Sequence, residues 1–537
     1  MRKILLFILT FSMIVSFALP FASVAAEEEA ADVIEIDTAE ELAAIENNLA
    51  GNYKLTADIV ATTGITGSFT GTFDGDGHKI SGLTTALFQQ ISGATVKNLT
   101  VSGDVVDSSS AAKQYGAIVI ESIERSGTVE NVIAEGTLTY DFNYLESYVG
   151  GVVGNCWAGS GWTEPNPEIN IIGCTNRATI NVIDPHKLST GGVIGFVGGY
   201  GIVNITECVN EGEIIGTYTS EVSSTVEASI AGIVGRAYEN TSNNREGSGD
   251  MIQVYITRCA NLAPITLTGP ETLTYKGNVA GIICQMTVGS IKYCYNVGNL
   301  VHNGTGETKG ILAYQNGKNN GSNKNFSMEY CYNISETPVN YEFCPGLNKI
   351  DWNALMIQGN CFLSREEQEE AVEAIVTNQY AFGGLKEENL NHGIGNFKFK
   401  TADSMFEKLV EFGYVMDYTV GYPVLPFQLK NLTLEHTEND GSSFFYQQNT
   451  TDASLIRVIG LLDTEVAKSA SAIEVTFSNG SDTKVFTIDN ATAYSSIDAT
   501  FDGVEVTYVA CDGAVILGWV FKGVPENYVP TTVEVVK

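Results

Sequence analysis

The chain has 537 residues, 29 Lys and Arg against 63 Asp and Glu, and a formal net charge of −34. So acidic a chain lacks the cations that displace counterions from a phosphate backbone and is repelled by anionic lipid, which excludes nucleic-acid binding and docking on anionic membranes. A charged content of only 17% with 55 glycines favours a β-rich repeat protein over a helical one, and the length allows two or three domains.

Residues 1–26 have the three parts of a secretory signal peptide. Arg2 and Lys3 give a positive start, residues 4–19 form an apolar run, and residues 23–26 are small enough for a cleavage site. The run is short for a membrane span and no basic stop-transfer flank follows it. We expect cleavage after about 25 residues, with a retained anchor as the alternative, and a protein that is secreted or at the cell surface without membrane insertion once the signal is removed.

Residues 27–60 are predicted to form an N-terminal capping strand and helix. Thr38–Glu41 matches a capping box, and Leu42, Ile45 and Leu49 recur on one helical face. An amphipathic helix over the open end of a solenoid would hide an edge that otherwise promotes aggregation.

Residues 61–345 contain two recurring patterns. The first reads small–Gly–apolar–apolar–Gly, and its copies begin at Gly150, Gly191, Ala231 and Ala280, with weaker copies at Tyr115 and Lys309. The second is an apolar strand ending in Cys-x-Asn, and its cysteines are Cys174, Cys208, Cys259, Cys294 and Cys331. Alignment places Leu99 and Val132 at the position of these cysteines, so that position accepts small apolar side chains.

Such short strands cannot bury a face alone, but stacked coil on coil they form ladders about 4.8 Å apart. The small apolar residues would fill a dry interior, and an Asn at a fixed place in each coil would hydrogen-bond along its ladder. Glycine would let the backbone turn tightly at each corner, and variable spacing would fall in loops. The repeats therefore predict a mainly β protein built on a parallel β-helix.

Five of the ten cysteines occupy one core position of the repeat. A buried Cys behaves as a small hydrophobic residue, so we expect free thiols, with oxidation of ladder neighbours as the alternative. Because the chain has no Cys-x-x-Cys pair and no His close to these cysteines, we expect no metal site.

The repeats resemble the GLUG family. Residues 150–154 and 191–195 carry its Gly-rich strand, residues 71–83 are similar to the first coil of such proteins, and residues 421–425 to the close of the region. The resemblance covers roughly residues 33–430. It implies an exported, adhesin-like right-handed parallel β-helix of Gram-positive or archaeal type, is specific for architecture and weak for function, and brings no shared catalytic residues.

Residues 346–437 depart from the repeat. Capping signals at Ser364 and Thr401 predict two helices that cover the C-terminal end of the solenoid, followed by a closing strand. A small independent helical domain is the alternative.

A polar linker at 438–443 precedes a change of pattern. Residues 451–537 alternate apolar and polar positions around turns such as Asn479-Gly480, which predicts a C-terminal antiparallel β-sandwich.

A search for chemistry finds no convincing catalytic set. A glycosidase needs two carboxylates at a set distance, and a lyase needs a base with acidic groups for Ca²⁺. Asp74, Asp76 and His78 lie close in sequence but fit a first-coil turn, and Asp184–Lys187 stands alone in a loop. We predict no catalytic residues, no metal and no cofactor, with a polysaccharide lyase or glycoside hydrolase as the alternative.

The insertion at residues 155–167 is the best candidate for ligand binding. It holds Trp157, Trp162 and Glu164 and follows Tyr148, and aromatic rings beside acidic groups suit sugar rings. The alternative is that both Trp side chains pack the loop onto the solenoid. We therefore expect a cell-surface binding or adhesion protein for a glycan or surface protein, a structural envelope component being a second alternative.

Overall fold

The computed structural model describes residues 33–107, 114–141, 147–159, 166–183, 188–219, 227–237, 252–270, 276–286, 288–315, 326–329, 331–333, 379–381, 414–417, 422–428, 432–436, 442–448, 454–461, 466, 469–489, 498–501, 504–508, 516–525 and 527–536. The expected signal peptide, the loop at Asp184–Lys187 and the helices beginning near Ser364 and Thr401 lie outside these residues. No helix within them is long and apolar enough to cross a membrane.

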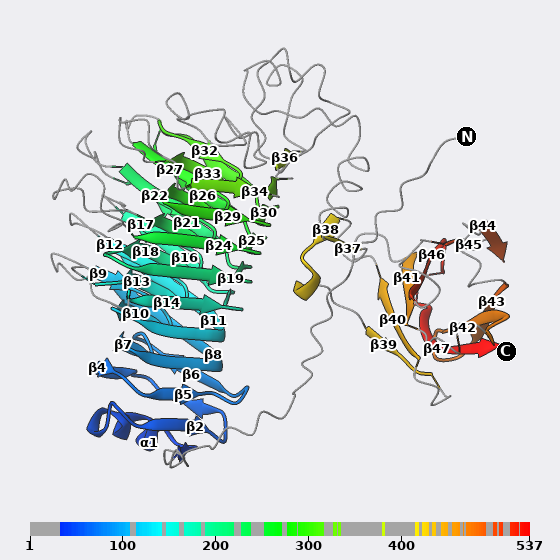
Figure 1. Cartoon of the computed structure of the whole chain (residues 1–537), viewed down its shortest axis with the longest axis horizontal. Helices are drawn as coiled ribbons and strands as arrows, with labels where there is room; N and C mark the ends of the chain where they lie inside the picture. Colours follow the sequence, from blue (N-terminus) through cyan, green and yellow to red (C-terminus); the bar gives the residue numbers. More distant parts are fainter. Residues whose placement is uncertain are drawn as a thin grey trace.

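From Val33 to Ala381 the described residues form three parallel sheets that stack coil on coil (Figure 1). Sheet A contains β1 (Val33–Ile36), β2 (Asn52–Leu55), β3 (Ile59–Val60), β5 (Thr72–Asp74), β6 (Lys79–Leu83), β8 (Ala94–Asp107), β11 (Gly127–Asp141), β14 (Glu168–Ile172), β15 (Thr175–Asn176), β16 (Thr179–Ile183), β19 (Ile202–Thr206), β20 (Val209–Asn210), β21 (Ile214–Thr217), β24 (Gln253–Thr257), β25 (Ala260–Asn261), β26 (Ile265–Thr268), β29 (Gly289–Lys292), β30 (Tyr295–Asn296), β31 (Leu300–His302), β34 (Phe326–Glu329), β35 (Cys331–Asn333) and β36 (Gln379–Ala381). Sheet B contains β4 (Ile65–Phe69), β7 (Phe88–Ile91), β10 (Ile120–Glu124), β13 (Val153–Trp157), β18 (Ile194–Gly198), β23 (Val234–Ala237), β28 (Ile283–Met286) and β33 (Leu312–Gln315). Sheet C contains β9 (Gln114–Gly116), β12 (Ser147–Gly150), β17 (Leu188–Gly191), β22 (Glu227–Ala231), β27 (Lys276–Ala280) and β32 (Thr308–Lys309). The predicted parallel β-helix is confirmed.

The N-terminal end of the solenoid carries α1 (Ala39–Ala44) and a 3₁₀ turn, η1 (Ile45–Asn47). Thr38 Oγ1 accepts from Glu41 N at 3.3 Å, and Glu41 Oε2 accepts from Asp37 N at 3.0 Å. The hydrogen bond from Asp37 N to this carboxylate is the largest cause that holds the pKa of Glu41 below its usual value. Leu42 and Ile45 are buried in the solenoid core, as the apolar spacing predicts.

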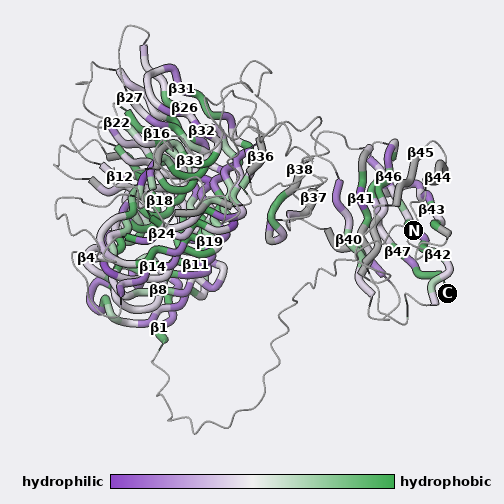
Figure 2. The backbone as a smooth tube through the Cα atoms, turned by 45° about the horizontal axis from the view of Figure 1, so that its top comes forward, coloured by the Kyte–Doolittle hydropathy of each residue, from purple (hydrophilic) through white to green (hydrophobic). Residues whose placement is uncertain are grey.

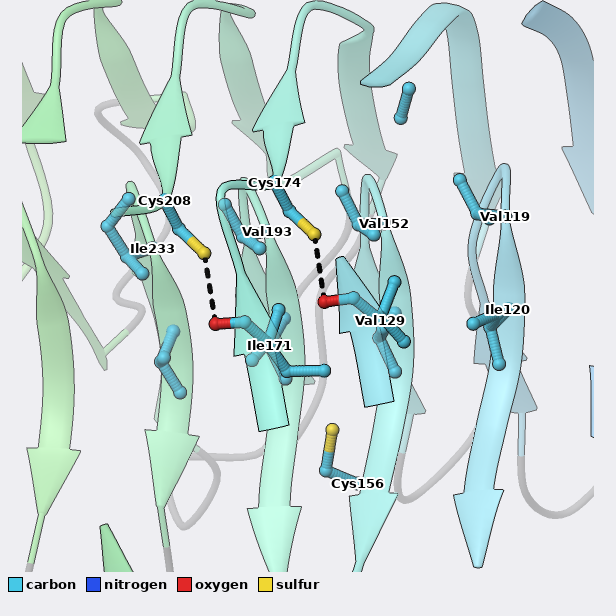
Figure 3. Packing of buried hydrophobic residues seen from close by; sticks show 14 of the residues in the cluster. Val119, Ile120, Val129, Val152, Cys156, Ile171, Cys174, Val193, Cys208 and Ile233 are labelled. Carbon is cyan, nitrogen blue, oxygen red and sulfur yellow. Dashed lines mark hydrogen bonds between the residues drawn. The ribbon is translucent and has the colours of Figure 1, made fainter. Parts of the chain in front are cut away.

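The Cys-x-Asn position forms one continuous buried column. Leu99 pairs with Val132, and the later cysteines follow in register through the strands from β15 to β35. The thiols of Cys174 and Cys208 donate to the carbonyls of Val129 and Ile171, each at 3.5 Å (Figure 3). The cysteines of the described part are free and buried, and burial raises the thiol pKa in this column.

A second buried ladder runs beside the cysteines. Each Asn donates from Nδ2 to Oδ1 of the Asn one coil further on, at 2.8 Å from Asn176 to Asn210 and at 2.7 Å for each later step through Asn261 and Asn296 to Asn333. The same Nδ2 also donates to the backbone carbonyl two residues ahead, so buried amides are satisfied within the coil and between coils. The expected asparagine ladder is therefore present.

The two sequence patterns meet where sheet C passes into sheet B. A Cβ added to Gly151 would lie 2.1 Å from Asn176 Oδ1, and one added to Gly192 would lie 2.2 Å from Asn210 Oδ1. Neither glycine has a positive φ. The predicted positions of these glycines are correct, but the predicted role in a tight turn is not. Glycine is required at these two positions because close packing against the asparagine ladder leaves no space for a side chain.

The weaker copy of the Gly pattern is shifted by two residues from the predicted alignment. Tyr115 pairs with Tyr148, so Ala117, and not Tyr115, occupies the position of Gly150. Gly116 serves another purpose, because an added Cβ would lie 2.3 Å from Cζ of Tyr140, whose buried ring fills that space. Gly116 and Gly151 therefore have different structural roles, although the sequence pattern aligns them.

The described residues after 413 form a hairpin and a sandwich. The hairpin pairs β37 (Val415–Asp417) with β38 (Tyr422–Val424), and η3 (Pro426–Gln428) follows. The expected closing strand thus pairs antiparallel in this hairpin; its Pro423 has no N–H to donate to a solenoid ladder. One sandwich sheet contains β39 (Leu432–Leu434), β40 (Ser443–Gln448), β41 (Leu455–Leu461), β44 (Asp498–Phe501), β45 (Val504–Tyr508) and β46 (Ile516–Lys522). The other contains β42 (Ala472–Ser478), β43 (Thr483–Asp489) and β47 (Val529–Val536).

The sandwich has its own core, which includes Phe477, Trp519 and Phe521. The antiparallel arrangement and the turn at Asn479-Gly480 are as predicted. The sandwich begins earlier than residue 451, because β39 and β40 pair in its larger sheet and Phe444 is buried in its core. Figure 2 shows hydrophobic and hydrophilic stretches in both the solenoid and the sandwich.

Candidate functional site

Tyr148 lies inside a stack of flat side chains between sheets B and C. Its ring is parallel to Tyr115 on one side, with centroids 5.7 Å apart, and to Phe196 on the other, at 4.1 Å. The guanidinium of Arg236 lies 5.4 Å from the centroid of Phe196 and extends the stack. Only 6% of the surface of Tyr148 is exposed, and both faces of its ring contact other aromatic rings. Its role is therefore to pack between neighbouring coils.

Trp157 ends β13 at the corner where sheet B leads back to sheet A, and it is half-buried. Strand register places it between Glu124 of the preceding coil and Gly198 of the following one. A Cβ added to Gly198 would lie 2.9 Å from Trp157 Cζ3 and 2.6 Å from Phe196 Cε1, so the missing side chain leaves room for both rings. Phe196 therefore links Trp157 to Tyr148.

The other two predicted binding residues, Trp162 and Glu164, lie outside the described residues. Of the predicted set, the structure thus places Tyr148 and Trp157, which it brings together through Phe196.

Glu124 is the acidic group that the sequence did not single out. It is the ladder neighbour of Trp157, and its Oε1 accepts from Ser122 Oγ at 2.9 Å. Asn155 Nδ2 in turn donates to Ser122 Oγ at 3.0 Å. Asn155 is 1% exposed, and its Oδ1 has no hydrogen-bond partner. Alignment of the coils across β10 and β13, which the shifted weak copy obscured, is the signal that would have found Glu124.

Tyr200, which is half-buried, lies in the corresponding connection from sheet B to sheet A one coil further on. Its backbone N donates to the carbonyl of Gly159 at 3.2 Å, and Gly159 has φ of 111° and no side chain to cover it. We call Glu124, Trp157 and Tyr200 the corner site. It combines aromatic surface with a carboxylate, the pair of groups that binds the apolar face and the hydroxyls of a sugar.

The aspartates of the first coil hold a turn, as predicted. Asp76 has φ of 49°, and its N donates to Asp74 Oδ1 at 3.0 Å. His78 contacts Asp58 and not these two aspartates, with Nδ1 3.2 Å from Asp58 Oδ1. Among the residues that the structure describes, no group of three or more His, Cys, Asp or Glu side chains is arranged to hold a metal ion.

Comparison with known families gives one partial similarity. A family model described as the M26 IgA1-specific metallo-endopeptidase N-terminal region matches residues 30–136, which span the cap and first coils. That region is not the catalytic domain of such peptidases, and it is found in large surface-exposed bacterial proteins of protease or adhesin-like type. No curated protein and no solved structure matches the chain.

Proposed function

We propose that this protein is an exported, surface-associated binding protein of the adhesin-like kind, in which a stiff solenoid presents recognition loops. The GLUG-like repeats, the signal-like N-terminus and the similarity over residues 30–136 support this assignment. One observation carries it: coils of different length keep the same ladder register.

The connections between the sheets divide into fixed and variable ones. Sheet C passes to sheet B through two residues in successive coils, namely 151–152, 192–193, 232–233 and 281–282. Sheet B returns to sheet A through residues 199–201 in one coil and 238–252 in the next, yet β19 and β24 pair residue by residue from Ile202 with Gln253 to Thr206 with Thr257. Sequence can therefore vary along this edge without disturbing the core, as a display scaffold requires.

We assign a carbohydrate to the corner site as its ligand, because Trp157 and Tyr200 supply aromatic surface and Glu124 supplies an acceptor for hydroxyls. Glu124 and Trp157 are half-buried and each is the last residue of a strand, which limits the ordering entropy that binding would cost. A surface protein is the alternative partner. The proposal is binding without bond cleavage, and a polysaccharide-degrading enzyme is the competing assignment.

A glycan array with residues 27–537 tests this proposal. Trp157→Ala should abolish most binding, and Glu124→Gln, which keeps the side-chain shape, should weaken it about tenfold, as for one hydrogen bond to a charged group. Tyr255→Ala is the matched control, since Tyr255 is a half-buried tyrosine of β24 in sheet A, away from the corner. Binding that survives Trp157→Ala would refute the corner site, and release of shortened glycan would favour the enzyme.

A further inference from the structure

Two stacked tyrosines mark a seat on the last described coils of the solenoid. Tyr295 and Tyr332 occupy the middle position of Cys-x-Asn, with ring centroids 4.8 Å apart and planes 2° from parallel. The same position in earlier coils holds Thr175, Val209 and Ala260. Since the flanking Cys and Asn are part of the interior, these tyrosines lie on the outer side of sheet A, yet both are fully buried.

The described residues 414–417 and 422–428, here called the strap, cover this seat. The Tyr414 ring stands edge-on to both tyrosines, at 6.2 Å and 81° to Tyr295 and at 5.2 Å and 79° to Tyr332. Gln428 Oε1 accepts from Tyr295 Oη at 2.8 Å and from Leu425 N at 3.1 Å. Tyr414 and Leu425, which flank the open end of the hairpin, are both almost completely buried.

In the sequence, the strap is separated from the sandwich by residues 429–431 and from β36 of the solenoid by residues 382–413. Only residues 429–431 separate Gln428 from β39, so the sandwich begins within about 14 Å of the seat. In the other direction, the chain from Ala381 to Tyr414 has a contour of up to about 115 Å. Without the strap, this longer segment alone would tether the sandwich.

We propose that the strap is an interdomain clasp, which docks on the tyrosine seat and fixes the C-terminal sandwich beside the last coils of the solenoid. Docking replaces a long tether by a short one. Because the strap and its seat belong to one chain, their effective concentration is high, and a few contacts suffice to keep the clasp closed. The proposal does not depend on what the corner site binds.

Small-angle scattering and limited trypsin digestion of the exported chain test the clasp. Tyr414→Ala should increase the radius of gyration and speed cleavage after Lys430, in the short connection, by about tenfold or more. Tyr295→Phe keeps the stack but removes the hydrogen bond to Gln428 and should give a smaller change in the same direction. Tyr255→Ala, on the same sheet, should leave both readouts unchanged.

Circular dichroism establishes that each variant is folded. If Tyr414→Ala does not fold, Gln428→Ala replaces it, because this change leaves every aromatic ring in place. Folded variants of Tyr414 or Gln428 with wild-type scattering and wild-type cleavage at Lys430 would overturn the clasp. Glycan binding at the corner site is expected to be unaffected, which separates this test from that of the proposed function.

Discussion

Replacing Asn210 by Ala tests the asparagine ladder most directly. Asn210 is fully buried, donates to Gly212 O at 3.0 Å and to Asn261 Oδ1 at 2.7 Å, and accepts from Asn176 Nδ2 at 2.8 Å. Each buried hydrogen bond contributes about 1 kcal/mol net, and partners left unpaired add a further penalty. We therefore expect the free energy of unfolding to fall by about 3–5 kcal/mol.

Asn204→Ala is the matched control for this change. Asn204 also donates twice, to Glu168 Oε1 at 2.8 Å and to Asn170 Oδ1 at 2.9 Å, but on the half-exposed outer face of sheet A. Water can replace those partners, so the expected loss is about 1 kcal/mol or less.

Equilibrium urea unfolding followed by far-UV circular dichroism would measure both variants. Loss of the ladder in one coil should also lower the steepness of the transition, because a solenoid unfolds as coupled neighbouring coils. Equal losses for Asn210→Ala and Asn204→Ala would refute the reasoning, since they would show that the buried ladder is worth no more than a surface one.

Three further predictions concern packing, thiols and pH. Gly192→Ala should lower the free energy of unfolding by about 2 kcal/mol or more, because its Cβ would collide with Asn210 Oδ1. The control, Gly127→Ala, whose nearest contact would be 3.3 Å, should lower it by less than about 1 kcal/mol. Similar thermal midpoints for the two variants would contradict this prediction. Cys208 should resist a thiol reagent in the native protein and react after denaturation, since burial raises its pKa, and rapid native labelling detected by peptide mass mapping would argue against the buried column. Burial lowers the pKa of His302 from 6.5 to about 4, so the folded state disfavours the protonated form of this side chain. The free energy of unfolding should therefore be at its full value above pH 6.5 and fall by no more than about 3 kcal/mol on acidification to pH 4. His302→Gln should remove this component of the pH dependence.

The repeat positions could be predicted because one buried slot has to be filled in every coil. The column from Leu99 to Cys331 follows from the recurring Cys-x-Asn strand and its alignment with Leu99 and Val132, and the strand register agrees with it. The capping box at Thr38 and the turn at Asn479-Gly480 are likewise local patterns whose partners lie within a few residues.

The candidate site was less accessible from the sequence because its parts come from different coils. Glu124 meets Trp157 only through register, and Gly116 misled the alignment because it makes room for Tyr140. Tyr148 was predicted from composition as a binding ring, but stacking by neighbouring coils covers both its faces. Whether an aromatic ring is exposed or packed between coils depends on residues that lie far away in the sequence.

The asparagine ladder has a direction: the amides from Asn176 to Asn296 donate toward the C-terminal end, and those from Asn210 to Asn333 accept from the N-terminal side. A duplicated coil inserted between any two of these would find an acceptor ahead of it and a donor behind it. The solenoid can therefore gain or lose whole coils during evolution with no change to its ends, so that its length and the number of its connecting loops can vary while the fold stays the same.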